Sequence, residues 1–473
     1  QKGRNTFFRI TPDANGLCVF AVKRGYLQNR IDVKNTLFNI SLIGTDAITV
    51  SLGSLCLEEP CYGTSATAIK RTDDSQPKYI RITDFDDFGI EEDHEYMAAE
   101  SYSSKHLLCP NDILFARTGG TVGKTYFYDG KIGEAVFAGY CIRFRFDKSK
   151  VIPKFVYWYT KTDTYQKWVN GIQRPVGQPN INKEEYKSFE IILPSITIQQ
   201  KLVDYMDAAD FSRKDKLYHA DDILDQTKNN VFETFGIHFE EYVPTLYSFT
   251  KLKNLLEIGI YCNPHSDYLN SAFSHLRENE FYAGALEDFV EINPTTSREG
   301  LHDSTSVSFV PMPAVEEKTN NVIYEVKQYK KVKTGFTIFQ KDDLLWAKIT
   351  PCMQNGKSFI ASNMPTQIGF GSTEFHVLRK KDERIYMPYL WVLLSDSHIL
   401  EAAQGMFSGS AGQQRVSDAF LKKFPMILPP IERQKKLADD VIDALEINRI
   451  TRKQAEQEWR AAKEQFEREL LGE

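Results

Sequence analysis

Two short segments, 192–196 (ILPSI) and 427–431 (ILPPI), are near copies of each other. A long stretch of helix-forming sequence follows each copy. Proline is well tolerated at the start of a helix, so each segment predicts a helix N-terminus directly after its Leu-Pro pair. Because both predicted helices follow the same signal, the chain is expected to consist of two equivalent halves.

Other repeats support this duplication. Segment 111–117 (NDILFAR) is echoed by 342–348 (DDLLWAK), and 123–125 (GKT) is echoed by 356–358 (GKS). The distance along the chain between partners hardly changes from one pair to the next. A duplicated chain suits a target with two similar half-sites, and duplex DNA is the commonest target of that kind.

Composition limits the possible classes of protein. The chain has 473 residues, of which 42% are hydrophobic, so two to four well-packed domains are expected. No apolar run is long enough to cross a membrane, and no secretory leader is visible. Seven scattered cysteines form no Cys-x-x-Cys pair, so neither a zinc ribbon nor a disulfide framework is indicated. We expect a cytoplasmic protein.

The net charge of −6 argues against a protein that coats nucleic acid indiscriminately, but basic residues gather locally. One stripe lies within 143–154 and another within 325–341. Such stripes can hold phosphates even on an acidic chain. Taken singly, each stripe is more typical of a solvated surface.

Short strand-like runs bounded by Gly and Asp turns predict two compact α+β domains with mixed, strongly bent sheets. The strands are followed in each half by a helix, near 154–168 in the first and 388–404 in the second. The predicted domain boundaries are 1–195 for the first globular domain, 196–245 for its helix, 246–430 for the second globular domain and 431–473 for its helix.

The two long helices carry apolar residues three and four positions apart, which is the pattern of a coiled-coil seam. Because they occupy equivalent places, we expect them to pack antiparallel on each other and to relate the domains by a pseudo-twofold axis. A helix of about 38 residues would be about 57 Å long, enough to separate two domains by one duplex turn. Packing of each helix on its own domain is the alternative. The seam residues are Leu217, Leu224, Val231, Leu437, Val441, Trp459 and Phe466, with Asn448 as a polar member.

Segment 119–125 (GGTVGKT) resembles a phosphate-binding P-loop, but Thr118 stands where that motif needs glycine. In the second copy Pro351 would remove a backbone N–H from the phosphate cradle. A nucleotide site is therefore not expected. A hairpin whose Lys124 or Lys357 and adjacent hydroxyl contact the DNA backbone is the better interpretation.

A polar, glycine-containing loop precedes each Leu-Pro motif, at 171–180 and 408–415. Arg, Gln and Asn are the side chains that pair with guanine and adenine edges, so Arg174 and Arg415 are the candidates for base readout. The residues expected to touch DNA are Arg117, Thr118, Lys124, Arg174, Gln178, Asn180, Lys348, Gln354, Lys357, Ser408, Gln413, Gln414 and Arg415.

No catalytic signature is apparent. The chain has no Asn-Pro-Pro-Tyr or Asp-Pro-Pro-Tyr tetrapeptide for amino-methyl transfer, no glycine-rich cofactor loop and no His-x-x-x-His. The carboxylates and lysine at 303–318 are better explained as a solvated loop than as a nuclease centre. We therefore expect no enzyme activity, no metal and no cofactor in this chain.

Taken together, segments 112–124, 308–316 and the Leu-Pro helices with 199–202 (QQKL) and 434–437 (QKKL) resemble the specificity subunit of type I restriction–modification systems. The resemblance spans about residues 25 to 473. It implies two target-recognition domains, each reading one half of a split DNA sequence, and two conserved-region helices. It also implies docking of methyltransferase subunits, probably two, and indirectly of a restriction/translocase subunit, in DNA methylation and defence against foreign DNA.

Two alternatives remain at this point. The chain could be the C-terminal specificity portion of a fused methyltransferase–specificity enzyme, whose catalytic half would lie upstream of Gln1. It could also be a coiled-coil scaffold that joins two peptide-binding domains. The scaffold would show no salt-dependent DNA binding.

Overall fold

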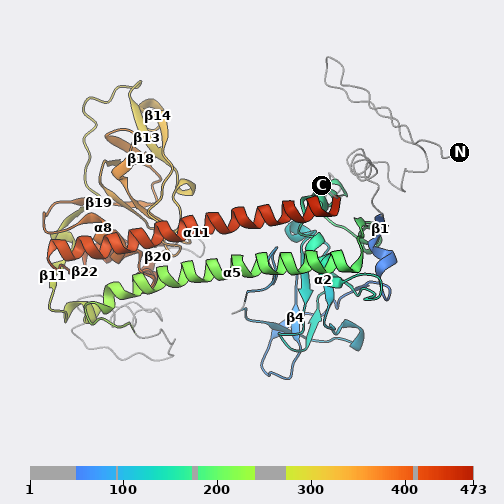
Figure 1. Cartoon of the computed structure of the whole chain (residues 1–473). Helices are drawn as coiled ribbons and strands as arrows, with labels where there is room; N and C mark the ends of the chain where they lie inside the picture. Colours follow the sequence, from blue (N-terminus) through green and yellow to red (C-terminus); the bar gives the residue numbers. More distant parts are fainter. Residues whose placement is uncertain (1–48, 92–93, 173–178, 240–272, 409–413, 472–473) are drawn as a thin grey trace, which may run out of the picture. The chain divides into compact units, whose positions relative to one another are not determined.

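The computed structural model describes residues 49–91, 94–172, 179–239, 273–408 and 414–471 (Figure 1). The chain divides into two compact units. Unit 1 comprises residues 1–215 and 454–473, and unit 2 comprises residues 216–453. Each unit combines bent sheets with helices, so the predicted α+β class is confirmed. Within the described ranges no helix is long and apolar enough to cross a membrane.

Unit 1 contains two four-stranded sheets and a small two-stranded one. Their orders are β2-β9-β6-β7, β3-β5-β4-β8 and β1-β10, and only the β4–β8 pair is parallel among these pairings. The strands are β1 (Thr49–Ser51), β2 (Cys61–Tyr62), β3 (Ala68–Lys70), β4 (Lys78–Ile80), β5 (Met97–Ala99), β6 (Asp112–Ala116), β7 (Thr125–Tyr128), β8 (Ala135–Phe137), β9 (Cys141–Phe144) and β10 (Glu190–Ile192).

Unit 2 repeats this plan with the orders β12-β19-β16-β17, β14-β13-β18-β15 and β11-β22, and adds the pair β20-β21. Figure 1 shows β13, β14 and β18 on the side of this unit away from α11. The strands are β11 (Tyr282–Ala285), β12 (Val290–Ile292), β13 (Ser306–Val310), β14 (Glu325–Gln328), β15 (Thr337–Gln340), β16 (Leu344–Ala347), β17 (Ser358–Ile360), β18 (Ile368–Gly371), β19 (Phe375–Lys380), β20 (Phe407–Ser408), β21 (Arg415–Val416) and β22 (Pro425–Ile427).

The pairs Asn111-Asp112 and Asp342-Asp343, at the starts of β6 and β16, build the same turn twice. Asn111 has a φ of 81° and Asp342 a φ of 69°, values that Asn and Asp tolerate better than most side chains. The next carboxylate, Asp112, accepts two hydrogen bonds from Arg145 at 2.7 and 2.8 Å. Asp343 accepts the equivalent pair from Arg379 at 2.8 and 2.7 Å. Both carboxylates are 1% exposed, so the repeated sequence is a structural signature of the fold.

The shorter helices differ from the prediction in one respect. The expected helix near 154–168 is two helices, α2 (Pro153–Tyr159) and α3 (Asp163–Ile172). Thr160 ends the first of them, and its hydroxyl hydrogen-bonds to the Thr125 hydroxyl at 2.6 Å. In unit 2 the expected helix near 388–404 is likewise α8 (Met387–Ser395) and α9 (Ser397–Gln404). Two further short helices are α4 (Lys183–Lys187) and α10 (Asp418–Lys422).

The long helices begin where the Leu-Pro motifs predict, α5 at Ile196–Glu233 and α11 at Ile431–Leu471. A buried glutamine in the first turn holds each start. Gln199 accepts from Ile152 N at 2.9 Å and donates to Pro194 O at 2.8 Å. Gln434 makes the equivalent bonds to Tyr386 N and Pro429 O at 3.0 and 2.8 Å. Each amide thus fastens its long helix to the globular part before it.

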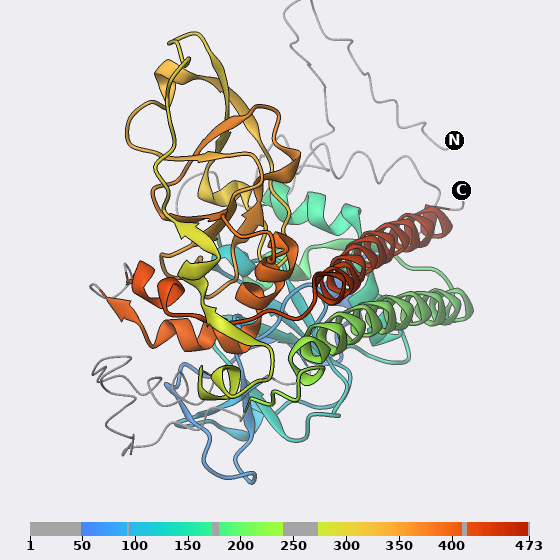
Figure 2. The ribbon, with the colours of Figure 1, turned by 90° about the vertical axis from the view of Figure 1, so that its left-hand side faces the viewer.

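In unit 2 the two helices run antiparallel and side by side (Figure 2). Arg433 donates to Thr234 O at 3.0 Å, and Asn448, which is 8% exposed, donates to Asp221 at 2.8 Å. Arg452 joins this contact through two bonds to Asp221, one of them 2.6 Å. Asn448 therefore lies on the seam, as its spacing predicts.

Most of the predicted seam residues also contact the globular parts. In unit 2 Val231, Leu437 and Val441 are buried in the core that contains Trp391, with half-buried Leu224 against it. In unit 1 Trp459 packs on Trp158 of α2 at 5.7 Å, and Phe466 packs on Phe155 at 5.8 Å. Leu217 is half-buried. Each helix is therefore part of a domain core as well as of a helix pair.

Candidate nucleic-acid interface

The candidate site of unit 1 lies directly after Ala116, the last residue of β6. We call it the first edge. Arg117 donates its backbone N–H to Tyr140 O at 3.0 Å, and its carbonyl accepts from Ile181 N at 2.8 Å. Thr118 pairs with Asn180 in an antiparallel bridge. Three segments far apart in sequence therefore meet as a short ribbon, and three predicted DNA contacts (Arg117, Thr118 and Asn180) lie together on it.

The Arg117 side chain is held from two directions. Its guanidinium lies over the Tyr62 ring, 4.8 Å from the centroid, and its Nε donates to Asn180 Oδ1 at 3.3 Å. Stacking on an aromatic face fixes the plane of a guanidinium without neutralising its charge. The neighbouring Tyr140 is 61% exposed. The first edge thus presents an oriented cation beside an exposed aromatic ring.

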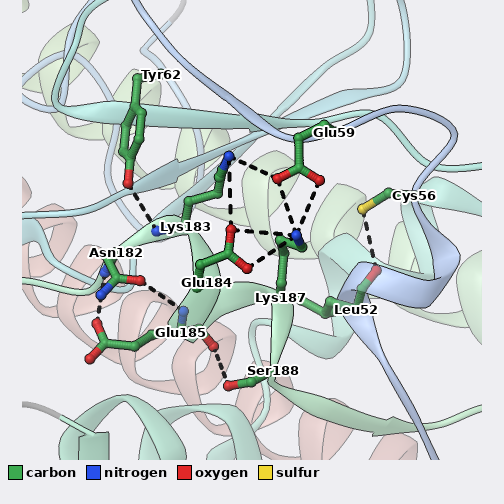
Figure 3. A network of polar contacts seen from close by, with 10 residues as sticks. All are labelled: Leu52, Cys56, Glu59, Tyr62, Asn182, Lys183, Glu184, Glu185, Lys187 and Ser188. Atoms are coloured by element: carbon green, nitrogen blue, oxygen red, sulfur yellow. Dashed lines mark hydrogen bonds and ion pairs between the residues drawn. The ribbon is translucent and has the colours of Figure 1, made fainter.

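A polar network keeps Tyr62 in place (Figure 3). The Tyr62 hydroxyl accepts from Lys183 N at 3.2 Å, at the start of α4. Asn182 caps that helix by accepting from Glu185 N at 2.9 Å. Glu59 lies 2.8 Å from Lys183 Nζ and 3.1 Å from Lys187 Nζ, and hydrogen bonds from these two lysines lower its pKa. The network ties α4 to β2, which carries Tyr62, and to Glu59 just before that strand.

Unit 2 builds the same ribbon beyond β16, which we call the second edge. Lys348 donates its backbone N–H to Glu374 O at 2.9 Å, and its carbonyl accepts from Val416 N at 2.9 Å. Ile349 pairs with Arg415 in an antiparallel bridge. Lys348, Glu374 and Arg415 therefore occupy the places that Arg117, Tyr140 and Asn180 occupy in unit 1.

Arg415 is engaged by a carboxylate on this edge. Its Nε and Nη2 donate to the two carboxylate oxygens of Glu374, both at 2.8 Å. This bidentate contact lowers the pKa of Glu374 and raises that of Arg415, so both remain charged at neutral pH. Behind the ribbon, His376 is 5% exposed and hydrogen-bonds to Val416 O at 2.9 Å. Arg415 was predicted to read bases, and its link to Glu374 is the feature that the sequence did not reveal.

The other predicted residues of unit 2 lie along the same edge. Gln414 accepts from Thr350 N through its carbonyl at 2.9 Å, and Ser408 pairs with Arg415 in the β20–β21 hairpin. The Gln354 side chain accepts from the Thr350 hydroxyl and donates to Gln404 at 3.2 Å. The structure thus brings Lys348, Gln354, Ser408, Gln414 and Arg415 to one end of the β16 sheet.

The prediction that the hydroxyls next to Lys124 and Lys357 contact the DNA backbone is wrong. Thr125 and Ser358 are each 1% exposed, so their hydroxyls do not project outward. They fasten strands to helices instead, Thr125 to Thr160 and Ser358 to Trp391 Nε1 at 3.1 Å. Lys124 is half-buried, while Lys357 is 16% exposed and lies 3.8 Å from Glu317. A small hydroxyl after Gly-Lys is explained by this packing, so only the lysines remain candidates for phosphate contact.

The two arginines of the first basic stripe are also paired within the fold, whereas its Lys148 and Lys150 are exposed. Arg143 pairs with Glu58 at 2.6 Å with its side chain 7% exposed, and Arg145 holds the Asp112 turn. In the second stripe Lys327 lies 3.5 Å above the Phe309 ring and Lys333 pairs with Asp303 at 3.2 Å. Net basic charge along a sequence does not reveal such partners, because they come from distant segments.

Three predicted contacts, Arg174, Gln178 and Gln413, lie outside the described residues. Three residues on the edges were missed by the sequence reasoning: Tyr62, Tyr140 and Glu374. Superposing the two repeats would have pointed to Tyr140 and Glu374, since each comes directly before the strand that pairs with β6 or β16. Among the described residues no cluster of His, Cys, Asp and Glu could hold a metal ion.

Comparison with known proteins identifies one family model and several relatives. The family model of the type I restriction modification DNA specificity domain matches twice, at residues 52–217 and 279–457. The specificity subunits of the Escherichia coli type I restriction enzymes EcoAI and EcoEI are 36% and 34% identical over 153 residues, about 32% of this chain. These matches span only 26% and 25% of the two relatives.

A solved chain from work on complex assembly and conformational transition of the type I R-M system shares the fold. Its TM-score is 0.51 at 12% identity, over 89% of this chain and 97% of that chain. The two family matches together cover most of the sequence, and each contains one of the two edges. The chain therefore belongs to the type I restriction–modification DNA specificity family.

Proposed function

We propose that this chain is the non-catalytic DNA-recognition subunit of a type I restriction–modification complex. Each edge would read one half of a bipartite target. The observation that carries the proposal is the pair of equivalent ribbons, both bearing a positioned cation, within two matches to a DNA specificity domain. Positioned Arg and Lys side chains are the usual readers of base edges and phosphates.

We further propose that methyltransferase subunits dock on the long helices, and the restriction/translocase subunit through them. A groove of about 700 Å³ between α5 and α11 in unit 2 supports this. Its lining combines Ile223 and Ile447, which are 46% and 50% exposed, with Gln226, Asn230 and Asp440. A mixed apolar and polar groove between two helices suits a helix of a partner protein. Catalysis, metal and cofactor would belong to those partners.

The test is a domain exchange. The chain is expressed with its methyltransferase subunits, and the modified sequence is mapped across the genome. Replacement of 246–430 by the corresponding segment of a relative should change one half of the mapped sequence. The other half, including the base that is methylated in it, should stay unchanged. A simultaneous change of both halves would contradict the assignment of one domain to one half.

The salt dependence of DNA binding by the wild-type chain distinguishes the proposed function from the coiled-coil scaffold. Binding to duplex DNA should weaken as salt increases, because phosphate contacts release counterions. A Lys124→Ala variant should bind every sequence more weakly and reduce the salt slope by about one unit. Binding that does not depend on salt would favour a coiled-coil scaffold without DNA recognition.

A further inference from the structure

The two edges have the same backbone but different chemistry at one equivalent position. At this position a backbone carbonyl accepts the N–H of the basic residue that follows the central strand. The carbonyl of Tyr140 accepts from Arg117 in unit 1, and that of Glu374 accepts from Lys348 in unit 2. In unit 1 this position presents an exposed phenol. In unit 2 it presents a carboxylate that points to Arg415. The difference lies in the side chains alone.

The fold does not need the Glu374–Arg415 pair. The equivalent residues of unit 1, Tyr140 and Asn180, contain no charge, although the same ribbon forms there. The pair is also unlike the buried Arg379–Asp343 contact, whose side chains are 16% and 1% exposed. Glu374 and Arg415 are 22% and 42% exposed and lie at the end of the sheet. A partly exposed ion pair of this kind contributes modestly to stability, and unit 1 forms the same ribbon without one, so stability alone does not explain its place on the edge.

A carboxylate is an unexpected neighbour for a surface that binds phosphates, since it repels them. It does, however, fix a guanidinium. Two parallel N–H···O bonds hold the plane of Arg415, whereas a single contact would let it rotate. A fixed plane is what bidentate recognition of guanine O6 and N7 requires.

We infer that Glu374 is a positioning residue for sequence readout, which orients Arg415 toward a base pair of the second half-site. This inference rests on the proposed function. Glu374 then lowers the affinity for DNA in general and raises the discrimination between sequences. The first edge orients its own cation by a different means, the Tyr62 ring and Asn180.

The experiment uses the full chain with its methyltransferase subunits and three duplexes. One duplex carries the sequence mapped for the wild type, one has a changed first half and one has a changed second half. Glu374→Gln should reduce the discrimination at the second half about tenfold, by tighter binding to the wrong duplex and weaker binding to the right one. Discrimination at the first half should not change. A purely structural role would not produce this split.

Two further variants serve as controls. Glu383→Gln removes the same charge from the same domain, where Glu383 is 95% exposed and pairs only with Lys380 among the ion pairs described. It should leave both discriminations unchanged. Glu374→Asp keeps the carboxylate and should restore most of the second-half discrimination.

The outcomes are distinct. Unchanged second-half discrimination in a folded Glu374→Gln variant would overturn the inference, and so would equal losses at both halves. Failure of the wild-type complex to discriminate any of the duplexes would instead contradict the proposed function.

Discussion

Two histidines in unit 2 have opposite pKa shifts. Burial is the main cause that lowers the pKa of His376, which lies 3.1 Å from Asn293 Nδ2. His398 hydrogen-bonds to Asp396 at 3.1 Å, and this contact raises its pKa. Folding therefore favours the neutral form of His376 and the protonated form of His398.

The His398 shift predicts a pH dependence of stability. The folded protein binds more protons than the unfolded chain at this site, so stability falls as pH rises. The contribution is fully present below the ordinary pKa of 6.5 and is lost as pH passes the raised value. His398→Gln should therefore reduce stability at pH 6 more than at pH 8, measured by denaturant unfolding. Equal losses at both pH values would mean that the Asp396 contact does not favour the protonated ring.

The role of the buried glutamine can be tested by comparing Gln199 with its exposed neighbour Gln200. Gln199 is 0% exposed, and its loss would leave Ile152 N and Pro194 O without their partner. Such a loss costs about 1–3 kcal/mol. Gln200, the next residue, is exposed, and its side chain donates to Asp204 on the same helix at 2.7 Å. Gln199→Ala should lower the free energy of unfolding by that amount, while Gln200→Ala should leave it within about 0.5 kcal/mol. Similar losses in both variants would contradict the role of the buried amide.

At the level of secondary-structure elements, local signals predicted local features. The Leu-Pro motifs predicted where α5 and α11 begin, and the repeated runs predicted β6 and β16. At the break between α2 and α3, which was missed, Thr160 bonds to Thr125, a partner in a distant strand that the local sequence does not reveal. For the same reason the sequence could not distinguish Arg415, which a carboxylate holds, from Arg117, which an aromatic ring holds.

The helix pair provides a prediction about register. Asn448 is the polar member of the seam, and both its partners, Asp221 and Arg452, are about half exposed. These partners can bond to water if Asn448 is replaced, so Asn448→Leu should fold with equal or greater stability. The axial register of the two helices should become less well defined, because a polar seam residue restricts how they can pair.

Distances between spin labels measure this effect. Labels at Gln226 and Asp443, which line the same groove of unit 2, should give one narrow distance in the wild type and a broader distribution in Asn448→Leu. Ala444→Leu, an apolar replacement on the same helix, controls for altered packing alone. An unchanged narrow distance in Asn448→Leu would mean that apolar packing fixes the register.

For the molecule as a whole, duplication supplies the same backbone arrangement twice, at the first and the second edge. The turn carboxylates, the glutamines and the small hydroxyls are repeated because the fold needs them twice. Under the proposed function, the residues on the edges differ because each half would read its own sequence. The sequence therefore predicts the family and the bipartite mode of recognition. The bases themselves depend on loop geometry and on side-chain contacts made across distant segments.

The last prediction concerns the gap between the two half-sites. Both long helices run continuously from one unit of the chain into the other, so their length should determine this gap. Seven residues inserted after Thr227 in α5, with seven more after Asp443 in α11, would preserve the heptad pattern. They would add about 10 Å, since each residue contributes about 1.5 Å.

The complex should then methylate the same two half-sequences with a gap longer by about three base pairs, at about 3.4 Å each. Genome-wide methylation mapping measures this directly, and the single insertion in α5 serves as the mismatched control. An active variant that keeps the original gap would show that the length of the helices does not set the spacing.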